Sequence, residues 1–178
     1  MSAPTSAKLV AMRIHIATDH AGLEFSQHLQ QYLASQGYEV IDHGPKEYDA
    51  LDDYPSFCIN AARAVAYDEE QGVQALGVVF GGSGNGEQIA ANKVKGIRAA
   101  LVWSDATATL AREHNNANVI AVGARQHTVE EAIRFIELFI TTPFPTEERH
   151  VRRIKQLAEY ETTGDIAGKE IVDPARNS

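Results

Sequence analysis

Short apolar segments alternate with longer amphipathic segments along almost the whole chain, and this alternation restricts the fold more than any other feature. Apolar runs predict strands at residues 13–18, 38–42, 76–80, 98–103 and 118–122. Helical spacing predicts helices at about 23–36, 55–69, 87–93, 104–113, 128–140 and 146–160. Strands that alternate with helices form parallel sheets covered on both faces. We therefore expect a three-layer α/β/α, Rossmann-like fold with a doubly wound, five-stranded parallel sheet.

Local signals place the beginnings of several of these helices. Ser104, Thr128 and Thr146 are residue types that cap helix N-termini, and Glu131 follows Thr128 at the spacing of a capping box. Pro55 suits the first position of its helix, where no backbone N–H is needed. These signals predict helix starts more firmly than helix ends.

The chain of 178 residues suits a single domain with one core. We predict a domain over residues 13–162, with flexible tails at 1–12 and 163–178, where apolar periodicity is absent and small or polar residues, Gly and Pro gather. The last helix should join the core through an apolar stripe at Val151, Ile154, Leu157 and Ala158.

Charge and cysteine usage exclude several function classes. The 16 basic and 24 acidic residues give a formal net charge of −8, which argues against a nucleic-acid partner or an anionic membrane surface. A few local cations can still hold a small anion. Cys58 is the single cysteine, so a disulfide framework is excluded and a cytoplasmic location is expected. No segment has the apolar length of a membrane span or signal peptide.

A glycine-rich loop follows the third predicted strand, at residues 81–87. Ligands of open parallel sheets bind beyond the carboxyl ends of the strands, where this loop lies. Its backbone N–H groups and the following helix start can hold a phosphate or a reaction oxyanion. The sequence has neither the Lys-Ser/Thr of a P-loop nor the last glycine of a dinucleotide fingerprint, because Glu87 stands there.

Glu87 has two interpretations that its spacing leaves about even. It can be a general base beside oxyanion donors, or it can simply complement the helix dipole. Arg149 and Arg153 share one helix face and suit a phosphate, although such a pair alone is more often a solvated face. His114 is at a predicted helix C-terminus, where an imidazolium is stabilised.

Several separated motifs occur together in one order. They are Asp19-His20-Ala21-Gly22, Asp53-Tyr54-Pro55, GGSGNGEQIAANK at 81–93, Ala99, REHNNAN at 112–118, and Arg149 with Arg153. Over residues 13–160 this set resembles ribose-5-phosphate isomerase type B, in the family that also contains galactose-6-phosphate isomerase. The resemblance implies a homodimer with its active site at the subunit interface, and neither metal nor cofactor.

Many members of that family carry a catalytic Cys where this chain has Gly81. The pattern here is similar to the actinobacterial-type subgroup, in which a Glu is the base, so the resemblance assigns that role to Glu87. It implies ring opening by His114 and proton movement assisted by Ser83. The implied substrate-binding residues are Asp19, His20, Gly82, Ser83, Gly84, Asn85, Gly86, Asn115, Arg125, Arg149 and Arg153.

The expected reaction is the interconversion of D-ribose 5-phosphate and D-ribulose 5-phosphate, in the non-oxidative pentose phosphate pathway. A hexose-6-phosphate isomerase acting on allose or galactose phosphates remains an alternative on the same scaffold. A flavodoxin-like module that binds a nucleotide or flavin, and a noncatalytic sugar-phosphate sensor, are more remote alternatives. The identity and position of Glu87 count against the nucleotide module.

Overall fold

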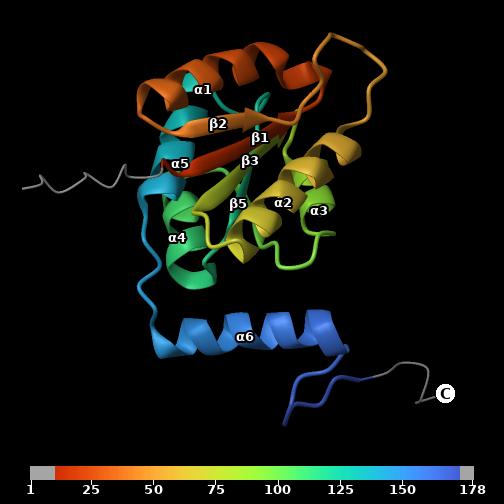
Figure 1. Ribbon diagram of the computed structural model, residues 1–178, viewed down its shortest axis with the longest axis vertical. Coiled ribbons are helices and arrows are strands. Elements are labelled where there is room, and N and C mark those ends of the chain that lie inside the picture. The colour runs from red at the N-terminus through yellow and green to blue at the C-terminus, as the bar shows by residue number, and fades with distance from the viewer. Residues whose placement is uncertain (1–10, 173–178) are drawn as a thin grey trace, which may run out of the picture.

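The computed structural model describes residues 11–172, and five strands within them form one parallel sheet (Figure 1). The strands are β1 (Arg13–Thr18), β2 (Glu39–Asp42), β3 (Ala75–Gly81), β4 (Ala99–Val102) and β5 (Val119–Gly123). Their order is β2-β1-β3-β5-β4, and every neighbouring pair is parallel. The predicted fold class is confirmed. Residues 1–10 and 173–178 lie outside the described residues; they are ten of the twelve residues of the predicted N-terminal tail and six of the sixteen of the predicted C-terminal tail.

Helices cover both faces of the sheet. They are α1 (Leu23–Ser35), α2 (Tyr54–Glu70), α3 (Asn85–Ala91), α4 (Asp105–Asn115), α5 (Val129–Thr141) and α6 (Glu148–Thr163), with a short 3-10 turn η1 (His20–Gly22) before α1. One buried apolar cluster joins α1, α4 and α5 to the sheet, and another joins α2 and α3 to its other face. Within residues 11–172 no helix is both long and apolar enough to cross a membrane.

The helix starts agree with the capping signals except at one position. Ser104 caps α4, and Thr128 forms a capping box with Glu131 at the start of α5, as predicted; Ser104 also forms a box with Thr107, which was not predicted. Thr146 is not an N-cap, because its φ of 57° is left-handed, whereas a capping residue needs extended backbone. Glu147 takes the N-cap position of α6 without a side-chain capping bond.

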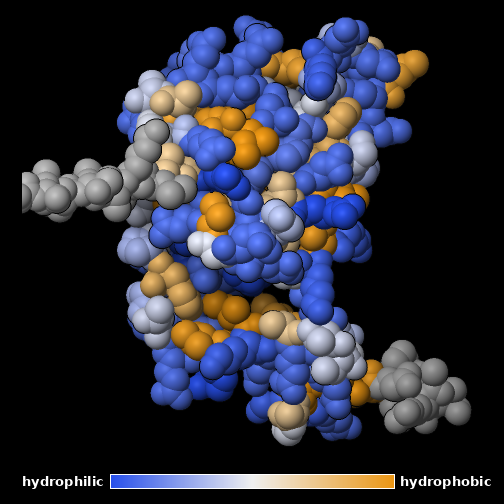
Figure 2. Space-filling view, in the orientation of Figure 1, coloured by the Kyte–Doolittle hydropathy of each residue, from blue (hydrophilic) through white to orange (hydrophobic). Residues whose placement is uncertain are grey.

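Helix α6 stands apart from the layered body, so the expectation that its apolar stripe completes the core was wrong. The extended segment 142–147 contains two prolines and carries α6 away from sheet faces that other helices already cover (Figure 1). A groove of about 370 Å³ separates α6 from the body. Figure 2 shows hydrophobic residues on both sides of it; Ile97, Ala99 and Ala100 line it opposite Ile154, Leu157 and Ala158.

Candidate active site

The direction of chain connection reverses between β1 and β3, and the ligand crevice of an open parallel sheet is expected at such a switch point, at the carboxyl ends of these strands. Thr18 of β1 pairs with Phe80 of β3, so Asp19 and Gly81 leave the sheet side by side.

The glycine loop turns sharply before α3. Gly84 has a φ of 79°, and a Cβ there would lie 2.8 Å from Leu101 Cδ1, so both conformation and space favour glycine. Helix α3 consequently starts at Asn85, two residues before the predicted start. Ser83 Oγ accepts hydrogen bonds from the Asn85 backbone N–H at 3.3 Å and side-chain amide at 3.2 Å. The loop therefore presents a tight turn with its backbone close to the crevice.

The carboxylate of Glu87 lies against the bare backbone of Gly81. Glu87 is 4% exposed, and a Cβ placed on Gly81 would be 1.9 Å from Glu87 Oε1. No side chain at position 81 can coexist with this carboxylate position, because real contacts of that length do not occur. Gly81 and Glu87 thus act as a pair: the glycine at the strand end makes the space that the carboxylate fills.

Burial raises the pKa of Glu87, and the negative charge of Asp19 raises it further. A hydrogen bond from the backbone N–H of Glu87 itself lowers the pKa; this effect is smaller than that of burial but larger than that of Asp19. A helix N-terminus alone would make this carboxylate a weaker base. Its burial instead favours the general-base interpretation over a simple complement to the helix dipole.

We expect a carbon-detected NMR titration of the Glu87 carboxyl group to give a midpoint above 4.5 in the free protein. Asp19→Asn removes the neighbouring negative charge, which makes ionisation easier, so the midpoint should move to lower pH. Glu87→Gln assigns the signal by removing it. An identical midpoint in the wild type and in Asp19→Asn would show that the two carboxylates are not coupled.

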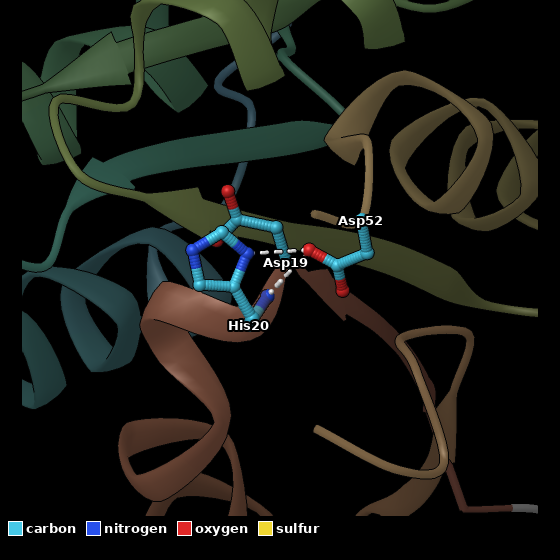
Figure 3. A group of neighbouring side chains, drawn as sticks. All are labelled: Asp19, His20 and Asp52. Carbon is cyan, nitrogen blue, oxygen red and sulfur yellow. Dashed lines mark hydrogen bonds and ion pairs between the residues drawn. The ribbon is translucent and has the colours of Figure 1, made fainter. Parts of the chain in front are cut away.

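His20 is held by Asp52, a residue that the sequence analysis missed. His20 Nδ1 lies 2.5 Å from Asp52 Oδ1 (Figure 3). Ligand atoms of Asp19, His20 and Asp52 lie within 4.8 Å of one another, as in a metal site. However, the His20 and Asp52 atoms already bond to each other, which matches a histidine–carboxylate pair better than a metal pocket. Only the adjacency of Asp52 to Asp53-Tyr54-Pro55 hinted at a role.

Arg125 extends the crevice beyond the glycine loop. Its side chain runs over Gly82, with Nη1 3.7 Å from the position of a Cβ on that glycine. Arg125 itself is exposed. The crevice edge of this chain therefore brings together seven of the sequence-predicted residues besides Glu87 and Ser83: Asp19, His20, Gly82, Gly84, Asn85, Gly86 and Arg125.

The remaining predicted residues lie at the opposite end of the sheet, beyond the amino ends of the strands. His114 and Asn115 end α4 just before β5 begins, and Arg98, which precedes β4, donates from Nε to the Asn115 carbonyl at 3.0 Å. Strand β3 has seven residues, so at ~3.3 Å per residue the amino and carboxyl ends of the sheet are about 20 Å apart. One copy of the chain therefore does not bring His114 and Glu87 together.

Helix α6 adds to this second group. The ring of His150 is buried and stacks on His114 with centroids 4.4 Å apart. Arg149 and Arg153 are exposed nearby on α6, and Arg149 Nε donates to Glu147 Oε2 at 3.0 Å. His114, Asn115, Arg149 and Arg153 thus form a second, outward-facing group, which we call the far-edge group.

Cys58 has no part in either group. It is fully buried in α2, and burial raises the pKa of its thiol to about 12. A thiol in this state is a poor nucleophile and a poor base.

Comparison with known proteins identifies one family of sugar-phosphate isomerases. The family model described as Ribose/Galactose Isomerase matches residues 14–157. The chain is 55% identical over 152 residues to ribose-5-phosphate isomerase B of Mycobacterium tuberculosis, covering 85% of this chain and 91% of that protein. It is 40% identical to galactose-6-phosphate isomerase subunit LacB of Clostridium acetobutylicum, covering 83% and 84%.

Comparison with solved structures points to the same family. Ribose-5-phosphate isomerase B from Mycoplasma genitalium with bound ribulose-5-phosphate aligns with a TM-score of 0.81 at 40% identity. The alignment covers 86% of this chain and 99% of that structure. The fold of most of this chain therefore has a counterpart in that protein.

Proposed function

Because this chain belongs to the ribose/galactose isomerase family, we propose that it is an isomerase that interconverts D-ribose 5-phosphate and D-ribulose 5-phosphate. Relatives that are 51–55% identical to this chain are named ribose-5-phosphate isomerase B, and one related structure holds ribulose-5-phosphate. We place the reaction in the non-oxidative branch of the pentose phosphate pathway, in the cytoplasm.

The observation that carries this proposal is the buried Glu87 carboxylate beside the glycine loop. Aldose–ketose isomerisation needs one base that moves a proton between C2 and C1 and donors that stabilise the enediolate oxygen. Glu87 supplies the base, and its raised pKa suits removal of a proton from carbon. Backbone N–H groups of residues 82–86 hold the oxyanion, and the Ser83 hydroxyl assists proton movement between O1 and O2.

The other residues open and hold the sugar. His114 transfers a proton involving the ring oxygen and so opens the furanose, while Asp19 and Asn115 bind hydroxyl groups. The phosphate lies at the far end of the crevice, where cations are needed. His20, Arg125, Arg149 and Arg153 take this role in the proposal, and guanidinium groups suit it because they bind phosphate oxygens with two hydrogen bonds.

The reaction requires a homodimer in this account. The far-edge group of one copy lies about 20 Å from Glu87 of the same copy by the strand length above, too far to share one sugar. A second copy that docks against the crevice edge supplies His114, Asn115, Arg149 and Arg153 to it. The detached α6 and the apolar groove beneath it support this arrangement, because both leave hydrophobic surface for a partner to cover.

A coupled assay on ribose 5-phosphate, with and without a chelator, tests the proposed reaction. Turnover that survives chelation supports it. The same assay on allose and galactose 6-phosphates compares kcat/KM between pentose and hexose substrates, an alternative that the similarity to a galactose-6-phosphate isomerase subunit keeps relevant. A larger kcat/KM on a hexose phosphate would move the assignment to that substrate.

Arg149→Ala should raise KM for ribose 5-phosphate by about tenfold while kcat changes little, because a phosphate contact is present equally in the ground and transition states. Steady-state kinetics measure both constants. Arg152→Ala is the matched control, since Arg152 is also an exposed arginine of α6. An unchanged KM in Arg149→Ala would mean that this arginine faces only solvent.

A further inference from the structure

Asp52 is a nearly buried carboxylate at the crevice that the proposed reaction does not use. Its side chain is 9% exposed, although it belongs to the loop between β2 and α2, which is otherwise open to solvent at many positions. Asp52 Oδ1 accepts a hydrogen bond from the backbone N–H of His20 at 3.1 Å and lies 2.5 Å from His20 Nδ1. Figure 3 shows both interactions converging on one oxygen.

This pair of interactions restrains the whole of His20. The backbone bond fixes where residue 20 lies against the loop, and the ring bond fixes the rotation of the imidazole. A carboxylate can only accept hydrogen bonds when ionised, so the bonded ring nitrogen carries the hydrogen. The second ring nitrogen, Nε2, is then left for a ligand. Tyr48 of the same loop meets the His20 ring edge-on, with centroids 5.8 Å apart, and restrains it further.

Stability alone does not explain Asp52. Its second oxygen, Oδ2, is buried and makes no hydrogen bond within the part of the chain that the structure describes. A buried carboxylate with one unsatisfied oxygen carries a desolvation cost that a neutral or apolar side chain would avoid. A carboxylate that occupies this position in spite of that cost points to a role in the site.

We propose that Asp52 is a positioning residue: its carboxylate accepts a hydrogen bond from Nδ1–H of the His20 ring and so directs Nε2–H to donate to the substrate phosphate. This inference rests on the proposed function for the identity of the ligand. The pairing itself is independent of that function. A carboxylate behind a histidine orients the ring in the same way in many metal sites. There the metal takes the lone pair of the other nitrogen, whereas a phosphate oxygen accepts from Nε2–H, so the His20 ring binds phosphate with a hydrogen on each nitrogen.

Four variants test the proposal: Asp52→Ala, Asp52→Asn, His20→Ala and the double variant Asp52→Ala/His20→Ala. Asp52→Ala should raise KM for ribose 5-phosphate about tenfold with kcat within about threefold of wild type, because binding and not chemistry is disturbed. Asp52→Asn should recover most of the loss, since its amide oxygen can still accept from Nδ1–H. The double variant should be no worse than His20→Ala alone.

Asp49→Asn is the matched control, because Asp49 is an exposed carboxylate of the same loop whose Oδ1 accepts from the Leu51 N–H, a bond that asparagine can keep. Circular dichroism confirms that each variant is folded. An additive loss in the double variant would overturn the proposal, since Asp52 would then act through something other than His20.

Nitrogen-15 NMR of the histidine rings gives a readout that does not depend on activity. Wild type should show His20 with its hydrogen on Nδ1, and Asp52→Ala should lose that preference. An unchanged signal overturns the link between Asp52 and His20. An unchanged KM in His20→Ala overturns the link to the phosphate instead, and the assay on wild type shows separately whether the isomerase function stands.

Discussion

Glu87→Gln should lower kcat for isomerisation by about 10³-fold, the range expected when a general base is removed. Glutamine keeps the shape of the side chain but cannot accept the proton from C2, so KM should change little. Steady-state kinetics in both directions measure the loss, because one base serves the forward and reverse proton transfers. The role of base is assigned to this carboxylate because it is buried and its pKa is raised.

Glu70→Gln provides the matched control, since Glu70 is an exposed carboxylate at the end of α2. It should retain wild-type kinetics. Near-normal turnover in Glu87→Gln would remove Glu87 from the role of base, and with it the mechanism proposed for this site.

Gly81→Ala should lower kcat by about 10²-fold or more, even though position 81 offers no group to the substrate. The new Cβ would lie 1.9 Å from Glu87 Oε1, so the carboxylate must move, and a displacement of about 1 Å in a catalytic group can cost ~10²-fold. The fold should survive, because the displaced atoms are the end of a flexible side chain. Thermal melting checks this point.

The combination Gly81→Ala/Glu87→Gln separates this effect from a general disturbance of the loop. If alanine acts only by displacing the base, the double variant should be no slower than Glu87→Gln alone. Wild-type turnover in Gly81→Ala would contradict the position of the carboxylate against the glycine.

Much of the fold could be predicted because its signals are local. The apolar run that became β3 is hydrophobic enough to identify a buried parallel strand, Ser104 is the N-cap that its residue type predicted, and Thr128 forms the capping box that its spacing to Glu131 predicted. Thr146 failed because a cap depends on backbone conformation, and its left-handed φ is not visible in the sequence.

The apolar stripe of α6 shows why a hydrophobic pattern can be correct while its location is not. Periodicity identified residues such as Leu157 that need an apolar neighbour, but it cannot say whether the neighbour belongs to the same chain. Leu157 is 56% exposed in one copy. The dimer proposed above supplies a surface to cover it.

The candidate site was predictable in its list of residues but not in its geometry. The order of the motifs predicted that Glu87, His114 and Arg149 belong to one active site. Within one copy, however, His114 and Arg149 lie at the end of the sheet opposite to Glu87. Asp52 was missed because its pairing with His20 joins residues 32 positions apart, for which neither spacing nor composition gives a signal.

A shared active site is the central claim, and purified heterodimers test it most directly. Glu87→Gln and His114→Asn subunits, carrying different tags and co-expressed, should form heterodimers in which one site contains both lesions and the other contains none. These heterodimers should regain about half of wild-type activity, although each parent homodimer is nearly inactive.

The reciprocal heterodimer pairs a wild-type subunit with one that carries both substitutions. Each of its sites then has one lesion, so it should be nearly inactive. If heterodimers of the two single variants stay as inactive as their parents while the reciprocal heterodimer keeps about half of wild-type activity, each site lies within one subunit and the account is contradicted.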